Sequence, residues 1–254
     1  MAKQSGLGDQ LWISGQDVSG DIGAVNKIAG GPAVIDVTPI NAYAMARIGG
    51  LRDGGIDYSA FWNPTNGVGQ PKSAHAVLSP LPTTDVIMTY VRGATLGGPV
   101  ACLNAKQLNY DGTRGDDGAM NFAGATQGNG YGLEWCLGLT AGQRTDTAGA
   151  NGDGVDFGTG PTAFGLQAYL HVFAFTGTSV TVKLQQSSDN GVGDAWTDIT
   201  GGGFTAATAG GAAQRIQTAR GQTVERYLRA VSTGTFTNAV FAVAVNRNPV
   251  ETEF

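Results

Sequence analysis

The chain has 254 residues, enough for one large β domain or two ordinary ones, and we expect two. Its 41 glycines, against an average usage of about 7%, follow no period of three, which excludes a collagen and predicts many tight turns. A net charge of −5 and a pI near 4.9 argue against a protein that grips DNA, and no apolar run approaches the roughly 18 residues that cross a bilayer.

The balance of apolar and charged residues points to contact between copies. Hydrophobic residues make up 41% of the chain and charged residues only 14%. Such a chain can fold, but it carries few of the surface charges that keep monomers apart. We therefore expect extensive self-association.

The first half is predicted to be mainly β. One short helix is expected over 39–48, because Thr38 can cap it, Pro39 suits its first turn and Gly49 can end it. A second helical turn is expected over 73–79, stopped by Pro80. The candidate strands are 10–14, 33–38, 55–62, 85–92, 100–110 and the glycine-interrupted stretch 119–135.

The turn signal DGTRGDDG lies between the last two of these strands. Residues 100–135 are therefore predicted to form one long hairpin, a shape suited to pairing with a neighbouring subunit. After it, the stretch 140–162 loses its apolar alternation to Gly, Thr, Asp and Asn. We place a first domain at 1–145, a linker at 146–162 and a second domain at 163–254.

The second domain shows a clear period of two. Val180, Val182 and Leu184 alternate with polar residues, which predicts a strand with one face on a core and one in water. Further strands are predicted at 166–174, 214–218, 223–232 and 235–246. Several short strands separated by turns indicate an immunoglobulin-like or jelly-roll β-sandwich.

No catalytic or cofactor motif stands out. The two histidines, His75 and His171, lie in no recognisable motif, so a structural role is expected for both, and neither a triad nor a zinc site is supported. The strings NGYG, GDGVDFG and GLRDGG lack nucleotide-binding spacing and are interpreted as turns. Cys102 and Cys136 are predicted to be buried free thiols, with a disulfide between them as the alternative. We predict no cofactor, no metal and no enzymatic activity.

Structural roles explain most of the acidic and aromatic residues in the loops. Asp189, Asp194 and Asp198 lie on or next to one loop, which favours a solvated turn over a pair of glycosidase carboxylates. Tryptophans are expected in cores or subunit contacts. Trp196 is the exception that we select as a candidate surface-ligand contact, because it follows a glycine-rich loop.

Four strings in order carry a family resemblance: GLRDGGIDYSAFWNP, HAVLSPLPTTDVIMTYVRG, GPVACLNAKQLNYD and DDGAMNFAGATQGNGYGLEW. Together they resemble the major tail tube proteins of long-tailed, non-contractile bacteriophages. The resemblance covers about the first three fifths of the chain. It implies a tail-tube-type β-barrel or sandwich domain with one short helix.

The resemblance also implies a function. Members of that family form stacked hexameric rings, whose inner β-barrel conducts the genome without binding it specifically. We therefore expect a virion protein that is assembled in the host cytoplasm and whose partners are itself and tail proteins such as the tape measure and the terminator. The lumen wall is expected to be acidic or neutral. The candidates for strands facing the lumen or a neighbouring subunit are Asp57, Ser59, Gln107, Asn109 and Asn121.

The second domain resembles β-sandwiches displayed on phage surfaces. It is expected to decorate the outside of the tail, with weak binding to host surface glycans as one role. Two alternatives remain open: a capsid decoration or cement protein, and a carbohydrate-binding module or glycan hydrolase on the second domain. Six-fold rings or tubes in a micrograph would favour the tail, whereas trimers on capsids would favour the cement protein.

Overall fold

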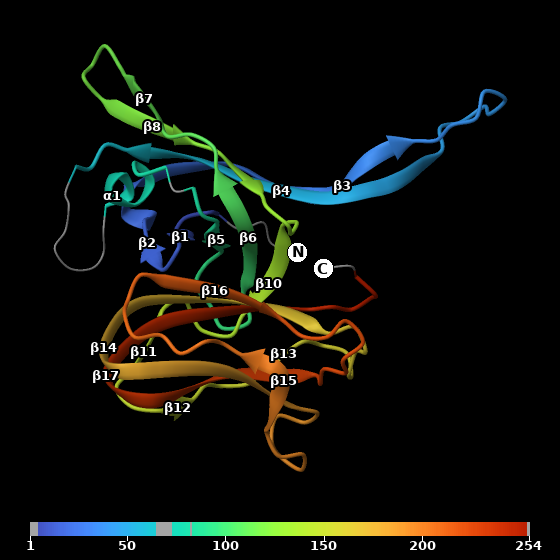
Figure 1. Ribbon diagram of the computed structural model, residues 1–254, viewed down its shortest axis with the longest axis vertical. Coiled ribbons are helices and arrows are strands. Elements are labelled where there is room, and N and C mark those ends of the chain that lie inside the picture. The colour runs from blue at the N-terminus through green and yellow to red at the C-terminus, as the bar shows by residue number, and fades with distance from the viewer. Residues whose placement is uncertain (1–4, 65–72, 82, 253–254) are drawn as a thin grey trace.

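The computed structural model describes residues 5–64, 73–81 and 83–252, and these are almost entirely β (Figure 1). This confirms the predicted fold class. The described helical elements are a 3₁₀ turn, Ser19–Asp21, and α1, Ala74–Leu78. The helix α1 matches the turn predicted at 73–79, and the Ser73 hydroxyl caps it by accepting from the Ala76 N–H at 3.3 Å.

A four-stranded antiparallel sheet, sheet B, forms the upper layer in Figure 1. Its two long strands pair from Ile22↔Ala60 to Asp36↔Arg47. Their distal half has no further strand beside it and projects from the body of the molecule (Figure 1). The strand order is β3 (Ile22–Asp36), β4 (Arg47–Phe61), β8 (Met120–Gly124) and β7 (Asp111–Arg114).

The helix predicted over 39–48 is wrong. Residues 37–46 form the end of the β3–β4 hairpin, and Arg47 and Ile48 already belong to β4. Thr38 closes this end rather than starting a helix: its Oγ1 accepts from the Ala46 N–H at 2.9 Å and donates to Asp36 at 2.6 Å. A helix of this length is marginal without a surface to pack on, and the projecting hairpin provides none.

The other sheet, sheet A, has 13 strands and runs through both halves of the chain. Its strands from the first half are β1 (Gln10–Ile13), β2 (Gln16–Asp17), β5 (Val86–Val91), β6 (Pro99–Gln107), β9 (Thr126–Gly128) and β10 (Glu134–Gly138). Those after residue 140 are β11 (Arg144–Asp146), β12 (Ala150–Asn151), β13 (Val155–Asp156), β14 (Leu166–Ser187), β15 (Thr197–Gly203), β16 (Ala212–Gln217) and β17 (Tyr227–Arg247).

Residues 99–137 pair as one bent hairpin that connects the two sheets. Its base is the β6–β10 pair, with Cys102 opposite Glu134, and its middle is the β6–β9 pair. Its end is the β7–β8 pair in sheet B, where Ser59 of β4 lies opposite Ala123. The inner faces of the two sheets enclose a core that includes Ile56, Tyr58 and Leu103.

The second half is built around the β14–β17 hairpin, whose strands are 22 and 21 residues long. Register shifts near Thr176 and Gly177 accompany a bend that lets each strand contribute to both faces of a sandwich. The core between these faces includes Leu184, Phe204 and Phe241. The segment predicted as a linker contains β12 and β13, which pair with β17, and Leu137 of β10 also pairs with Val245.

A polar and aromatic seam joins the two halves. His171 is fully buried there; its Nδ1 accepts from the Gly15 N–H at 3.0 Å and its Nε2 lies 2.8 Å from the Thr89 hydroxyl. The rings of Trp12 and Phe173 pack against it. Burial lowers the pKa of His171 to about 3, which fits a neutral structural histidine. Cys102 and Cys136 lie in the same cluster as buried free thiols, as predicted.

Candidate assembly surfaces

The projecting end of the β3–β4 hairpin, residues 32–51, is here called the arm. It is roughly 30 Å long at about 3.3 Å per residue of strand. Eight large hydrophobic side chains on it are exposed, and Ile40 and Tyr43 are completely so. The full set is Val34, Ile35, Val37, Ile40, Tyr43, Met45, Ile48 and Leu51.

The exposed apolar area of the arm is large for a monomer. These eight residues lie on both faces of the ribbon and together expose roughly 1,000 Å², and the largest single apolar patch on a typical monomer is about 300–600 Å². A stable interface buries about 800 Å² per partner. A two-stranded ribbon is also only marginally stable in water by itself. The arm therefore has the area and the chemistry of one side of a protein–protein interface.

Sheet B has two free edges as well. β3 and β7 are its outer strands, so each presents unpaired backbone groups along one side. β3 carries register shifts between Ile22 and Ala24, between Val25 and Lys27, and between Pro32 and Val34. Bulges of this kind keep an edge strand from pairing indiscriminately.

The outer face of sheet B carries more carboxylates than ammonium groups. Asp57 and Ser59 lie on it, because their neighbours Ile56, Tyr58 and Ala60 are the β4 residues that face the core. The Asp57 carboxylate is 4.0 Å from the Lys27 ammonium. Three carboxylates and one ammonium share this face, from Asp53, Asp57, Asp111 and Lys27.

The other three residues predicted to face the lumen or a neighbouring subunit are Asn121, Gln107 and Asn109, and they differ in exposure. Asn121 lies on β8 opposite Phe61, beside the outer face. Gln107 is buried and donates to the Leu78 carbonyl at 2.8 Å, so it holds α1 against β6. Asn109 accepts from the Ala125 N–H at 2.8 Å and stabilises the bend between β6 and β7. The structure brings Asp57, Ser59 and Asn121 together on one sheet and places Gln107 inside.

Trp196 is half-buried at the end of the sandwich. The Arg229 guanidinium lies 4.5 Å from the centre of its ring system, so this side of the indole is covered. A Cβ added at Gly191 would lie 2.5 Å from the indole nitrogen, so the loop backbone is packed tightly against it. Trp196 has a packing role here, and its contact with a surface ligand stays a prediction.

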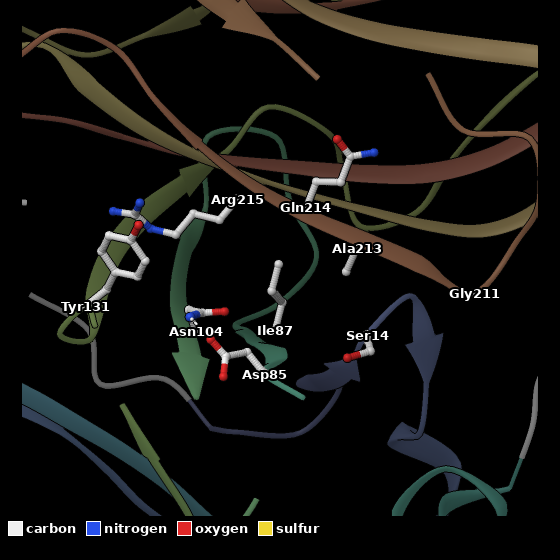
Figure 2. A pocket seen from close by; sticks show the side chains of 9 residues that line it. All are labelled: Ser14, Asp85, Ile87, Asn104, Tyr131, Gly211, Ala213, Gln214 and Arg215. Carbon is white, nitrogen blue, oxygen red and sulfur yellow. Dashed lines mark hydrogen bonds between the residues drawn. The ribbon is translucent and has the colours of Figure 1, made fainter. Parts of the chain in front are cut away.

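A hollow of about 360 Å³ lies between the two halves, with Asp85 and Asn104 on one side and β16 residues on the other (Figure 2). Asp85 is paired with Lys106 at 2.7 Å, which lowers the pKa of that carboxyl. Arg215 is 2.9 Å from the buried Glu134 and 3.6 Å from the centre of the Tyr131 ring. The Arg215–Glu134 pair joins the two halves, whereas Asp85 is paired within the first half. Among the described residues, the hollow presents no nucleophile beside a base.

The described residues also give no support for a metal site or a membrane-spanning helix. No group of three or more His, Cys, Asp or Glu in this part of the chain could hold a metal ion. His75 packs among Trp62, Tyr110 and Phe122. None of the helices that the structure describes is long and apolar enough to span a membrane. Surfaces, rather than a cleft with reactive groups, are the distinctive features of the molecule.

The fold is all-β, and its distinctive surface feature is the exposed apolar arm. Comparison with known proteins finds low similarity to several solved structures. No protein-family model matches the chain, and no curated protein matches it. A solved structure titled as the virion of a native gene transfer agent particle is similar at 14% identity and a TM-score of 0.40, over 52% of this chain and 98% of that chain.

Two further solved structures are similar to the chain at comparable levels. The tail of an empty gene transfer agent particle with C6 symmetry gives the same identity, TM-score and coverage. The SPP1 Dit protein, described as a paradigm of the hub adsorption apparatus in phages that infect Gram-positive bacteria, has 12% identity and a TM-score of 0.33, over 94% of this chain and 99% of that chain. Because these TM-scores are below 0.5, the similarities carry no weight in assigning a function to this chain.

Proposed function

We propose that the chain is a structural subunit of a phage-type tail tube, which assembles into rings that stack around a central channel. The observation that carries the proposal is the arm, whose apolar side chains are left exposed by the rest of the described chain. The outer strands β3 and β7 support it, because one copy's four-residue β7 can pair with part of the next copy's β3 and so continue sheet B from copy to copy.

The outer face of sheet B supports the same function. If the sheet closes into a barrel with this face inward, the channel wall carries Asp53, Asp57 and Asp111 against Lys27 from each copy. A wall with this negative balance repels the DNA backbone and lets a genome slide through without being held. The second half would then lie outside the tube, where its loops are accessible to other tail proteins or host surface glycans.

Electron microscopy of the purified chain tests this function. We expect six-fold rings or tubes from the wild type, and dispersed monomers from a variant with Ile40→Asp and Tyr43→Asp on the arm. Val192→Asp is the control, because Val192 is an apolar, 89% exposed side chain in the β14–β15 loop of the second half. Trimers that bind capsids would instead identify a cement protein. A wild type that remains monomeric at high concentration would refute self-assembly.

A further inference from the structure

One row of paired residues runs straight across sheet B. Asp111 of β7 lies opposite Ala123 of β8, which also pairs with Ser59 of β4. Ser59 in turn pairs with Ala24 of β3. All four residues lie on the outer face, because residues directly opposite in an antiparallel pair share a face. β7 runs opposite to β3, so a β7 paired with the next copy's β3 continues the antiparallel order of the sheet.

The geometry of a closed sheet restricts where β7 can pair along β3. Closure requires a stagger of the register, and the strands of barrels are typically tilted by about 35–45°. With Asp111 opposite the neighbour's Ala24, the row would return at its own level, and the strands would have no tilt. Because β3 begins at Ile22, a tilted sheet needs β7 to pair further along this strand.

The register shifts of β3 restrict the position further. Between these shifts β3 has two short regular stretches, 24–25 and 34–36, and a longer one of six residues, 27–32. The outer-face residues of the longer stretch are Lys27, Ala29 and Gly31. Within this stretch, Asp111 can share a face with its partner only opposite one of these three residues.

The tilt distinguishes the three registers. Measured along β4, Lys27, Ala29 and Gly31 lie two, four and six residues beyond Ala24. The four strands of one copy span about 19 Å at about 4.8 Å each, and each residue adds about 3.3 Å of stagger. Asp111 opposite Ala29 then gives a tilt of about 35°, whereas Lys27 gives about 19° and Gly31 about 46°. Of the three, the register at Ala29 falls at the lower end of the usual range.

We propose that β7 of one copy pairs with the stretch 27–32 of the next copy's β3, with Asp111 opposite Ala29 and Thr113 opposite Lys27. This inference rests on the proposed self-assembly and adds the register of the joint between copies. The two paired edges differ, so the contact is head-to-tail, and its repetition produces a closed ring or a helical filament rather than a two-fold dimer.

Charge favours the same register. The Lys27 side chain is 59% exposed, and its ammonium is 4.0 Å from the carboxylate of Asp57. Asp111 accepts from the neutral side-chain amide of Asn109 at 2.5 Å. In the proposed register Lys27 and Asp111 are diagonal neighbours across the joint, about 7–8 Å apart and within reach of a long side chain. The ammonium then lies between carboxylates of two copies.

A disulfide between positions 29 and 111 requires two copies. β3 and β7 are the opposite edges of sheet B, three strand spacings or about 14 Å apart. The Cα atoms of a disulfide-bonded pair are usually within about 7 Å of each other. A cross-link between these positions therefore reports only the joint between copies.

Disulfide trapping tests the register. Asp111→Cys and Ala29→Cys are combined in one chain, the protein is assembled and oxidised with diamide, and the products are separated on a non-reducing gel. We expect a ladder of covalent multimers. Asp111→Cys with Ala24→Cys, which reports the level register, is the matched control and should give at least about tenfold less cross-linked product. The native thiols, Cys102 and Cys136, are buried.

A second position makes the test independent of one substitution. Thr113→Cys with Lys27→Cys lies opposite in the same register and should also cross-link. Thr113→Cys with Ala29→Cys reports the register displaced by two residues and should not. Sedimentation and thermal unfolding of each reduced variant show that it assembles and keeps its fold.

The outcomes separate this inference from the function on which it rests. If the variants assemble but a control pair cross-links in place of the two proposed pairs, the register is overturned while the tube function stands. If they assemble and none of the pairs cross-links, the pairing of β7 with β3 is overturned, and self-assembly must use other surfaces. If the wild type never assembles, the proposed function fails, and this register fails with it.

Discussion

The buried His171 makes a specific contribution to the pH dependence of stability. Its pKa is lowered from the ordinary value of 6.5 to about 3, because burial penalises the charged ring. Between these values the unfolded chain binds a proton that the folded chain does not. Stability contributed by the neutral ring is therefore complete above pH 6.5 and is lost as the pH falls toward 3.

The size of the effect is set by this pH window. Each pH unit below 6.5 costs about 1.4 kcal/mol, so the free energy of unfolding falls by about 2 kcal/mol between pH 6.5 and pH 5. Carboxyl groups with lowered pKa values, such as those of Asp85 and Asp198, act in the same direction but at lower pH. The interval from pH 6.5 to 5 thus isolates the histidine.

Urea unfolding followed by tryptophan fluorescence measures this effect, and Trp12 beside His171 is a suitable reporter. The wild type should lose about 2 kcal/mol over the interval, whereas His171→Asn, which has no group titrating there, should lose little. His75→Asn removes the other histidine and is the control. If His171→Asn keeps the wild-type slope, or if His75→Asn abolishes it, the reasoning from burial is refuted.

Four other predictions can be tested with the same material. Arg247→Met should lower the free energy of unfolding by roughly 3 kcal/mol in urea titrations, because it removes the side-chain donor to the carbonyls of Thr159, Gly160 and Glu225 and one of two donors to that of Phe157; a loss below about 0.5 kcal/mol would contradict this. Gly124→Ala should cost roughly 2 kcal/mol, since its Cβ would lie 2.4 Å from the Tyr58 ring, whereas Gly203→Ala, with open space, should cost much less. Assembly should weaken between 0.05 and about 1 M NaCl if charged contacts orient the subunits, and salt-independent sedimentation would argue against them. If Trp196 binds sugar, a glycan array should show binding that Trp196→Ala removes, and no signal above background for the wild type removes the idea.

Periodicity predicted the sandwich strands well, but it did not predict their length. The alternation around Val180 and the one that begins at Leu166 belong to a single strand, β14. Between them, the bend near Thr176–Gly177 has polar residues and glycine, which interrupt the pattern as a turn between two strands would. A bent strand and a hairpin turn are therefore indistinguishable from the local sequence.

The arm shows a different limit of sequence reasoning. Thr38 and Pro39 are ordinary helix-start residues, and the apolar residues after them suit a helix packed on a sheet. What decides the structure is that the hairpin projects and offers no surface for such packing. The burial of Gln107 has a similar cause: a polar residue at a strand end is usually exposed, and only the fold places the Leu78 carbonyl within its reach. Both outcomes depend on contacts between distant segments.

The three bulges of β3 affect how copies meet before assembly. A regular edge strand can pair with any copy in several registers, and the wrong registers are hard to escape once many backbone bonds have formed. The shifts near Ile22, Val25 and Pro32 divide this edge into short stretches of different orientation. In the proposed assembly, a misaligned neighbour would gain only a few bonds and would dissociate quickly, so errors of register would be corrected as the assembly grows.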